Sequence, residues 1–88
     1  MLKIESLRTA DGRLKLRVEG RVIGPWVSEL QRACEQALGE GVGLALDLSE
    51  VAFVDHTGLE FLCTLGQQGV VLDCSAFVAE QLRAQGWR

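Results

Sequence analysis

The chain has little of the chemistry that enzymes and metal sites need. It contains one histidine, His56, and no tyrosine. Its three cysteines are odd in number and far apart, which fits neither a disulfide framework nor a zinc motif. The glycine-containing segments 39–43 and 66–69 match neither a P-loop nor a dinucleotide fingerprint. We therefore expect a protein that is not an enzyme, with no catalytic residue, no metal site and no cofactor.

Long apolar runs and an excess of positive charge are also missing. No apolar run reaches the length of about 18 residues that indicates a membrane span. Residues 1–5 alternate polar and apolar side chains and lack the apolar core of a signal peptide, so we expect a cytoplasmic protein. The net charge of −3 offers no basic surface for nucleic acid.

What the chain does contain is the composition of a small globule. Apolar residues make up 48% and charged residues 24% of its 88 residues, so we expect a single domain over residues 1–88. A chain this short buries only a modest core. Binding to a partner would add to its stability, and a weak homodimer is compatible with this expectation.

Changes in hydrophobic period predict the order of the elements. Strand-like alternation on both sides of Asp11-Gly12 predicts an antiparallel hairpin, in which the second strand includes residues 14–19. A helix follows that begins at Gly24-Pro25 and that Gly39 or Gly41 ends. The remaining predicted elements are a strand from about Val42 to Leu48, a helix from Thr57 to Gly66, a strand from Val70 to Leu72, and a helix that Ser75 caps and that runs to about Gln85.

This order, β-β-α-β-α-β-α, predicts an α/β fold. Crossovers between parallel strands are right-handed, which places their helices on one side of the sheet. We therefore expect a four-stranded, mostly parallel sheet in sequential order, with the first strand antiparallel and three helices on one face.

The segment Asp55-His56-Thr57-Gly58-Leu59 carries the strongest functional signal. It has the residue types of a nucleophile triad, but consecutive residues cannot align in series as a triad requires. One interpretation is a helix cap, in which Asp55 or Thr57 accepts a bond from a first-turn N–H. The other is that Thr57 accepts a phosphate at the positive end of a helix. The two interpretations are compatible, because the hydroxyl of a capping residue is exposed and fixed in place.

The segment from Leu44 to Leu59 resembles the centre of STAS domains, the fold of bacterial anti-sigma factor antagonists. There an apolar strand is followed by Asp-Ser-Ser/Thr-Gly-Leu, which opens a helix. The resemblance implies that Thr57 is the residue phosphorylated by a partner anti-sigma factor, a serine/threonine kinase. Asp55 matches the leading aspartate of the motif, and Gly58 matches its glycine. It also implies that the unphosphorylated form binds the partner and that phosphorylation releases it.

The helix that follows the motif offers a docking surface. Thr57, Phe61 and Thr64 recur at helical spacing beside the apolar stripe, so we expect them to contact a partner. Phe61 is either a partner anchor or a residue that borders the core. Trp26, in the first turn of the first helix, is a similar candidate. His56 replaces the usual small residue of the motif, and we favour a side chain that points to solvent over one that tunes the site near neutral pH.

A second function class fits the same fold. Compact STAS domains also serve as non-enzymatic subunits docked on the ATPase of lipid-transport ABC systems, where this helix would be a constitutive interface. In such subunits the position of Thr57 is often a small residue without a hydroxyl, and the hydroxyl lies one position earlier. The threonine at position 57 therefore favours the phosphorylation switch.

Overall fold

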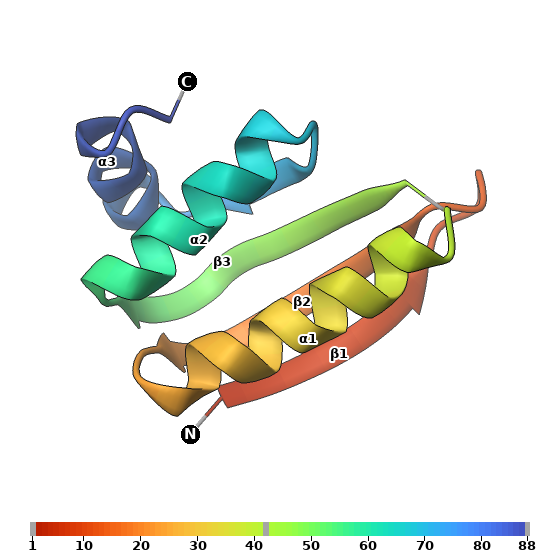
Figure 1. Ribbon diagram of the computed structural model, residues 1–88, viewed down its shortest axis with the longest axis horizontal. Helices are drawn as coiled ribbons and strands as arrows, with labels where there is room; N and C mark the ends of the chain where they lie inside the picture. The colour runs from red at the N-terminus through yellow and green to blue at the C-terminus, as the bar shows by residue number, and fades with distance from the viewer. Residues whose placement is uncertain (1, 42, 88) are drawn as a thin grey trace.

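The computed structural model describes residues 2–41 and 43–87 and has the predicted order of elements (Figure 1). In this part of the chain, no helix combines the length and apolar character needed to cross a membrane. The elements are β1 (Leu2–Arg8), β2 (Leu14–Val22), α1 (Pro25–Gly39), β3 (Leu44–Val54), α2 (His56–Gln67), β4 (Val71–Cys74) and α3 (Ala76–Ala84).

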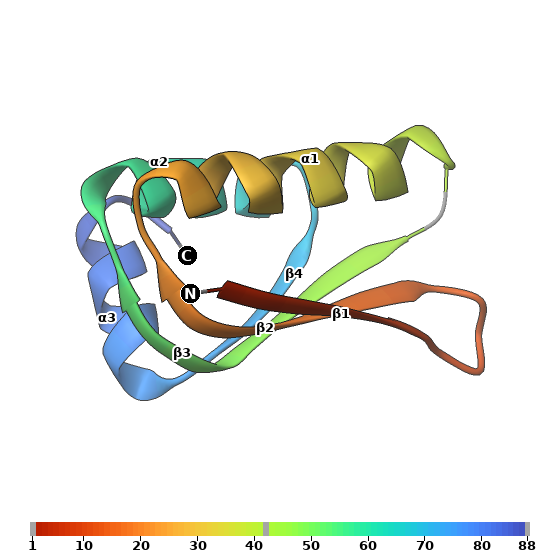
Figure 2. The same ribbon diagram turned by 90° about the horizontal axis from the view of Figure 1, so that it is seen from below.

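The four strands form one sheet in the order β1-β2-β3-β4. Strand β1 is antiparallel to β2, while β2, β3 and β4 are parallel. Figure 2 shows α1 and α2 as a layer along one face of the sheet, with α3 beside the bend of β3. All three helices contribute side chains to one hydrophobic cluster, so the predicted α/β fold with its helices on one face is confirmed.

The core lies between this helical layer and the inner face of the sheet. Strand residues alternate between the two faces, so every second residue at the start of β3 points inward. The helices meet this apolar face with residues spaced three or four apart. The fully buried large side chains include Leu16, Val18, Leu30, Leu46, Leu48, Leu62, Val78 and Leu82.

Strand β3 is longer than the sequence pattern predicts. It begins at Leu44, while Val42, its predicted start, lies outside the described residues. It continues past Leu48 to Val54, although strict alternation of burial stops after Leu48. The register with β2 shifts between the pairs Arg17–Asp47 and Glu19–Glu50, so an irregularity hides the rest of the strand from a period-of-two reading. The extension brings β3 directly to the start of α2.

Candidate functional site at the start of helix α2

The carboxylate of Asp55 organises the start of α2. Its backbone is extended, and its Oδ1 accepts a 2.8 Å bond from the N–H of Gly58, which is an N-cap. Its Oδ2 accepts a 2.9 Å bond from the N–H of Gly24, 31 residues earlier in the chain. The bonds from Gly24 and Gly58 hold the pKa of Asp55 below its usual value. One side chain therefore both caps α2 and ties it to the loop that follows β2.

Gly58 lets the first turn of α2 lie directly on the strand ends. A Cβ atom at this position would stand 2.8 Å from Cγ1 of Val54 and 3.0 Å from the carbonyl oxygen of Val22. The Val22 carbonyl also accepts a 3.0 Å bond from the N–H of Asp55. Because backbone atoms cannot swing aside as a flexible side chain can, the glycine fixes how closely α2 approaches β2 and β3.

The hydroxyl of Thr57 is exposed on the second residue of α2. Asp55 provides the cap, so of the two capping residues considered from the sequence only Asp55 has that role. Among the described residues, no side-chain hydrogen bond involves Thr57. The hydroxyl of Thr57 therefore lies at the start of a helix that Asp55 already caps, and it takes no part in the hydrogen bonds that hold this start in place.

His56 is exposed beside Thr57, and its ring forms a bond with a neighbour on the same helix. Nε2 of His56 lies 2.7 Å from Oε1 of Glu60, and both side chains are more than half exposed. The i,i+4 spacing that brings them together is a regular feature of helices. Glu60 was missed from the sequence, although this spacing could have identified it.

The other predicted contact residues divide between surface and core. Thr64 is exposed, and its hydroxyl donates a 3.0 Å bond to the carbonyl of Glu60. Phe61 is half-buried and packs against the core. It lies four residues after Thr57 and three before Thr64, so its exposed part is next to them on α2. Leu59, the last residue of the motif, is a core residue with 7% of its surface exposed.

Trp26 lies half-buried in the first turn of α1, after a sharp turn at Gly24. Gly24 has a φ of 52°, in the left-handed region that favours glycine, and its N–H donates to Asp55. The N–H of Trp26 donates a 3.0 Å bond to the carbonyl of Ile23. The bond between Gly24 and Asp55 therefore holds the start of α1, with Trp26, next to the start of α2.

Comparison with known families agrees with this arrangement. A family model described as "Mlab, STAS domain" matches residues 5–87, which is nearly the whole chain. The chain belongs to the STAS domain family. No curated protein matches it. STAS domains generally mediate protein–protein interactions. In this STAS domain, α2 presents the exposed Thr57 and the half-buried ring of Phe61.

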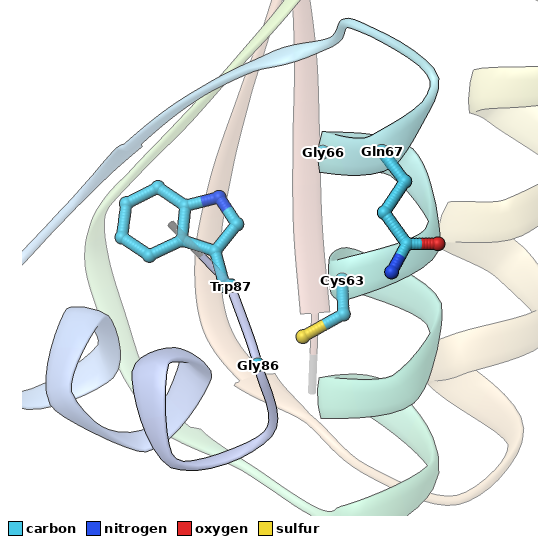
Figure 3. A pocket seen from close by; sticks show the side chains of 5 residues that line it. All are labelled: Cys63, Gly66, Gln67, Gly86 and Trp87. Atoms are coloured by element: carbon cyan, nitrogen blue, oxygen red, sulfur yellow. The ribbon is translucent and has the colours of Figure 1, made fainter.

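A separate hollow of about 380 Å³ lies at the other end of α2 in this STAS domain (Figure 3). Cys63, Gly66, Gln67, Gly86 and Trp87 line it. The indole of Trp87 packs closely on Gly66: a Cβ atom at position 66 would lie 2.9 Å from Cδ1 of Trp87. The Cys63 thiol donates to the carbonyl of Leu82, and burial raises its pKa. The hollow therefore marks the packing seam between α2 and the C-terminal segment, without a reactive group.

Proposed function

We propose that this STAS domain is a cytoplasmic, non-enzymatic regulator of the anti-sigma factor antagonist type. It binds a partner anti-sigma factor with serine/threonine kinase activity, and phosphorylation of Thr57 switches binding off. The observation that carries this proposal is the free, exposed hydroxyl of Thr57 beside a cap that Asp55 already provides. A hydroxyl without a structural role can be modified without loss of the fold.

The charges around Thr57 support the direction of the switch. A phosphate adds about −1.5 to −2 charge near neutral pH. Thr57 lies two residues after Asp55 and three residues before Glu60 in the sequence, and the ring of His56 already contacts Glu60. The positive end of α2 tolerates the phosphate within the free protein. A partner that buries the neutral hydroxyl would face an unpaired dianion in its interface, which is strongly unfavourable. Phosphorylation therefore weakens binding more than it weakens folding.

Phe61 extends the docking surface along α2. It lies one helical turn after Thr57, and Thr64 follows it by nearly another turn. Because Phe61 is already held against the core, its partner contacts cost little side-chain entropy. A rigid aromatic side chain with a polar rim is typical of interface hot spots. We therefore assign Phe61 as the apolar anchor of the docking surface.

The test begins with capture of the partner on the purified domain and its identification by mass spectrometry. Binding of that partner is then titrated against wild type, Thr57→Ala and Thr57→Glu. We expect Thr57→Ala to bind within about twofold of wild type, and Thr57→Glu to bind at least about tenfold more weakly. With ATP present, wild type should be phosphorylated and released, whereas Thr57→Ala should stay bound.

Ser75 provides the matched control for the modification. It is also a hydroxyl residue at a helix start, but it is half-buried and its Oγ accepts a 3.4 Å bond from the N–H of Val78. Phosphate should therefore map to Thr57 and not to Ser75. Equal affinity of all three Thr57 forms, or phosphate on Ser75 alone, contradicts the switch.

A second candidate is a constitutive subunit docked on the ATPase of a lipid-transport ABC system. The match to the Mlab STAS domain favours this function. It uses the same helix, so Phe61→Ala weakens binding under both proposals. The two differ at Thr57, because a constitutive interface is not released by ATP and a kinase. Capture of an ABC ATPase that stays bound in the presence of ATP, without phosphate on Thr57, would select the second candidate.

A further inference from the structure

Strand β1 is an open edge of the sheet, since β2 is its one neighbour among the described strands (Figure 1). The backbone pattern shows which groups face that edge. Next to β1, the N–H of Thr9 donates a 2.9 Å bond to the carbonyl of Arg13, in line with the β1–β2 register. Along an antiparallel strand, the N–H and C=O groups of successive residues point alternately to one side of the strand and to the other. Because Thr9 directs its N–H to β2, the odd-numbered residues of β1 also direct their backbone groups to β2. Leu2, Ile4 and Ser6 therefore direct theirs to the free edge.

On the outer face of the sheet, the charged residues of β1 lie opposite residues of opposite charge on β2. Glu5 is opposite Arg17, which is opposite Asp47 on β3. Lys3 is opposite Glu19, with Nζ and Oε2 3.7 Å apart. On the inner face, Leu2 and Ile4 are half-buried and pack at the border of the core. The edge thus presents a basic and an acidic residue outward and an apolar pair inward.

We propose that β1 pairs with β1 of a second copy of this chain, antiparallel about a two-fold axis at Ile4. In this register Ile4 lies opposite Ile4, and each Lys3 lies opposite Glu5 of the second copy. The free backbone groups of Leu2, Ile4 and Ser6 then fall into hydrogen-bonded pairs. The charges then alternate in sign across the new edge, from Arg17 and Glu5 of one copy to Lys3 and Glu19 of the other, whereas within each sheet Glu19 lies opposite Glu50. The result is a continuous sheet with helices on one face.

The charges also select this register over its neighbours. A two-fold axis that passes through any one residue of β1 places even-numbered residues opposite even-numbered residues of the second copy. Their free backbone groups can then bond to each other, so hydrogen bonding alone does not choose among these registers. An axis at Glu5 places two carboxylates directly opposite one another, and an axis at Lys3 does the same with two ammonium groups. Residues 2–8 contain no proline, and their pairing with β2 shows no bulge, two devices that often block edge pairing.

The expected association is weak, because one pair of edge strands buries less than the roughly 1,200–2,000 Å² of a stable interface. We expect a dissociation constant in the range of about 10–100 μM. This dimer uses no residue of the docking surface on α2. It therefore stands or falls independently of the function proposed for Thr57.

Sedimentation velocity with two charge-reversed variants tests the proposal. Lys3→Glu makes the outer side of the edge acidic, and Glu5→Lys makes it basic, so each variant should dimerise at least about tenfold more weakly than wild type. An equimolar mixture should form a heterodimer of at least wild-type affinity, because every acidic position then faces a basic one. Each variant has the same charges by itself as in the mixture. A gain in affinity on mixing therefore cannot result from a change in the folding of either chain.

Two further variants separate edge pairing from general charge effects. Lys15→Glu makes the same change in net charge on β2 and should leave dimerisation within about twofold of wild type. Ser6→Pro removes one N–H at the free edge and none from the β1–β2 ladder, so it should weaken the dimer at least about tenfold while the far-UV circular dichroism is retained. Wild type that remains monomeric at about 1 mM, or a mixture that fails to associate, overturns the proposal.

Discussion

Replacement of Asp55 by alanine tests whether one carboxylate holds the candidate site together. The change removes the N-cap bond to Gly58, worth about 0.5–2 kcal/mol. It also removes the bond from Gly24, worth about 1 kcal/mol for an exposed partner. The expected loss is about 1.5–3 kcal/mol of unfolding free energy. For a domain of this size it corresponds to a fall in Tm of about 6–24 °C.

Asparagine at the same position separates the two bonds. The amide oxygen of Asp55→Asn can still accept from Gly58, but its NH₂ group faces the N–H of Gly24 and cannot accept from it. We therefore expect a loss of about 1 kcal/mol, well below that of the alanine variant. Asp47→Ala is the matched control. Within the part of the chain that the structure describes, that carboxylate accepts hydrogen bonds only from the nearby Ser49, so its loss should change stability by less than about 0.5 kcal/mol.

The pH dependence gives an independent check on the same residue. The pKa of Asp55 in the folded protein is lowered from its ordinary value of 3.8. The unfolded chain therefore binds the proton more readily, and stability from this group is complete above that ordinary value. It is lost as the pH falls through the lower pKa of the folded state. The difference in urea-unfolding free energy between wild type and Asp55→Asn should stay constant from pH 7 to about pH 5 and shrink below about pH 4. Equal losses for the alanine and asparagine variants, or a difference that grows in acid, would refute the reasoning.

Two further predictions concern packing and thiol chemistry. Gly58→Ala should lower the unfolding free energy in urea by about 1–3 kcal/mol, since its Cβ meets the strand backbone, whereas Gly39→Ala, with open space, should raise it by at most about 1 kcal/mol. A gain from Gly58→Ala would contradict the close approach. Burial raises the pKa of Cys34 to about 12 and that of Cys74 to about 11. Both thiols should react with Ellman's reagent at pH 8 far more slowly in the folded protein than in urea, Cys34 slowest.

The fold was predictable because its periods are distinct along most of the chain. The alternation in β2 and the Asp11-Gly12 signal give the hairpin, and Gly12 has the positive φ of 85° that its turn requires. The second half of β3 was missed for an equally physical reason. Its buried residues Leu48, Val51 and Val54 are three apart, because the register with β2 shifts. A spacing of three residues matches neither the period of two of a regular strand nor the i, i+3, i+4, i+7 pattern of an amphipathic helix.

The site was predictable only where its contacts are local. The motif predicts a cap at Asp55 or Thr57, because a cap is made within four residues of chain, and the structure assigns it to Asp55. The bond from Gly24 to Asp55 spans 31 positions and depends on how β2 and β3 pair. The tight contact of Gly58 with Val22 likewise exists only in the folded sheet. Such long-range contacts leave no periodic trace in the sequence.

These long-range contacts bear on the proposed switch at Thr57, because they hold the start of α2 in place without that residue. Asp55 fixes the backbone of Gly24 and Gly58, and Gly58 fixes the helix against β2 and β3. None of these contacts uses the hydroxyl of Thr57. A charge placed on that hydroxyl therefore meets a frame that does not need to rearrange, and its effect falls on whatever is docked there. Under the proposed function, the domain would keep one conformation with or without the phosphate, and the modification would change only its affinity for the partner.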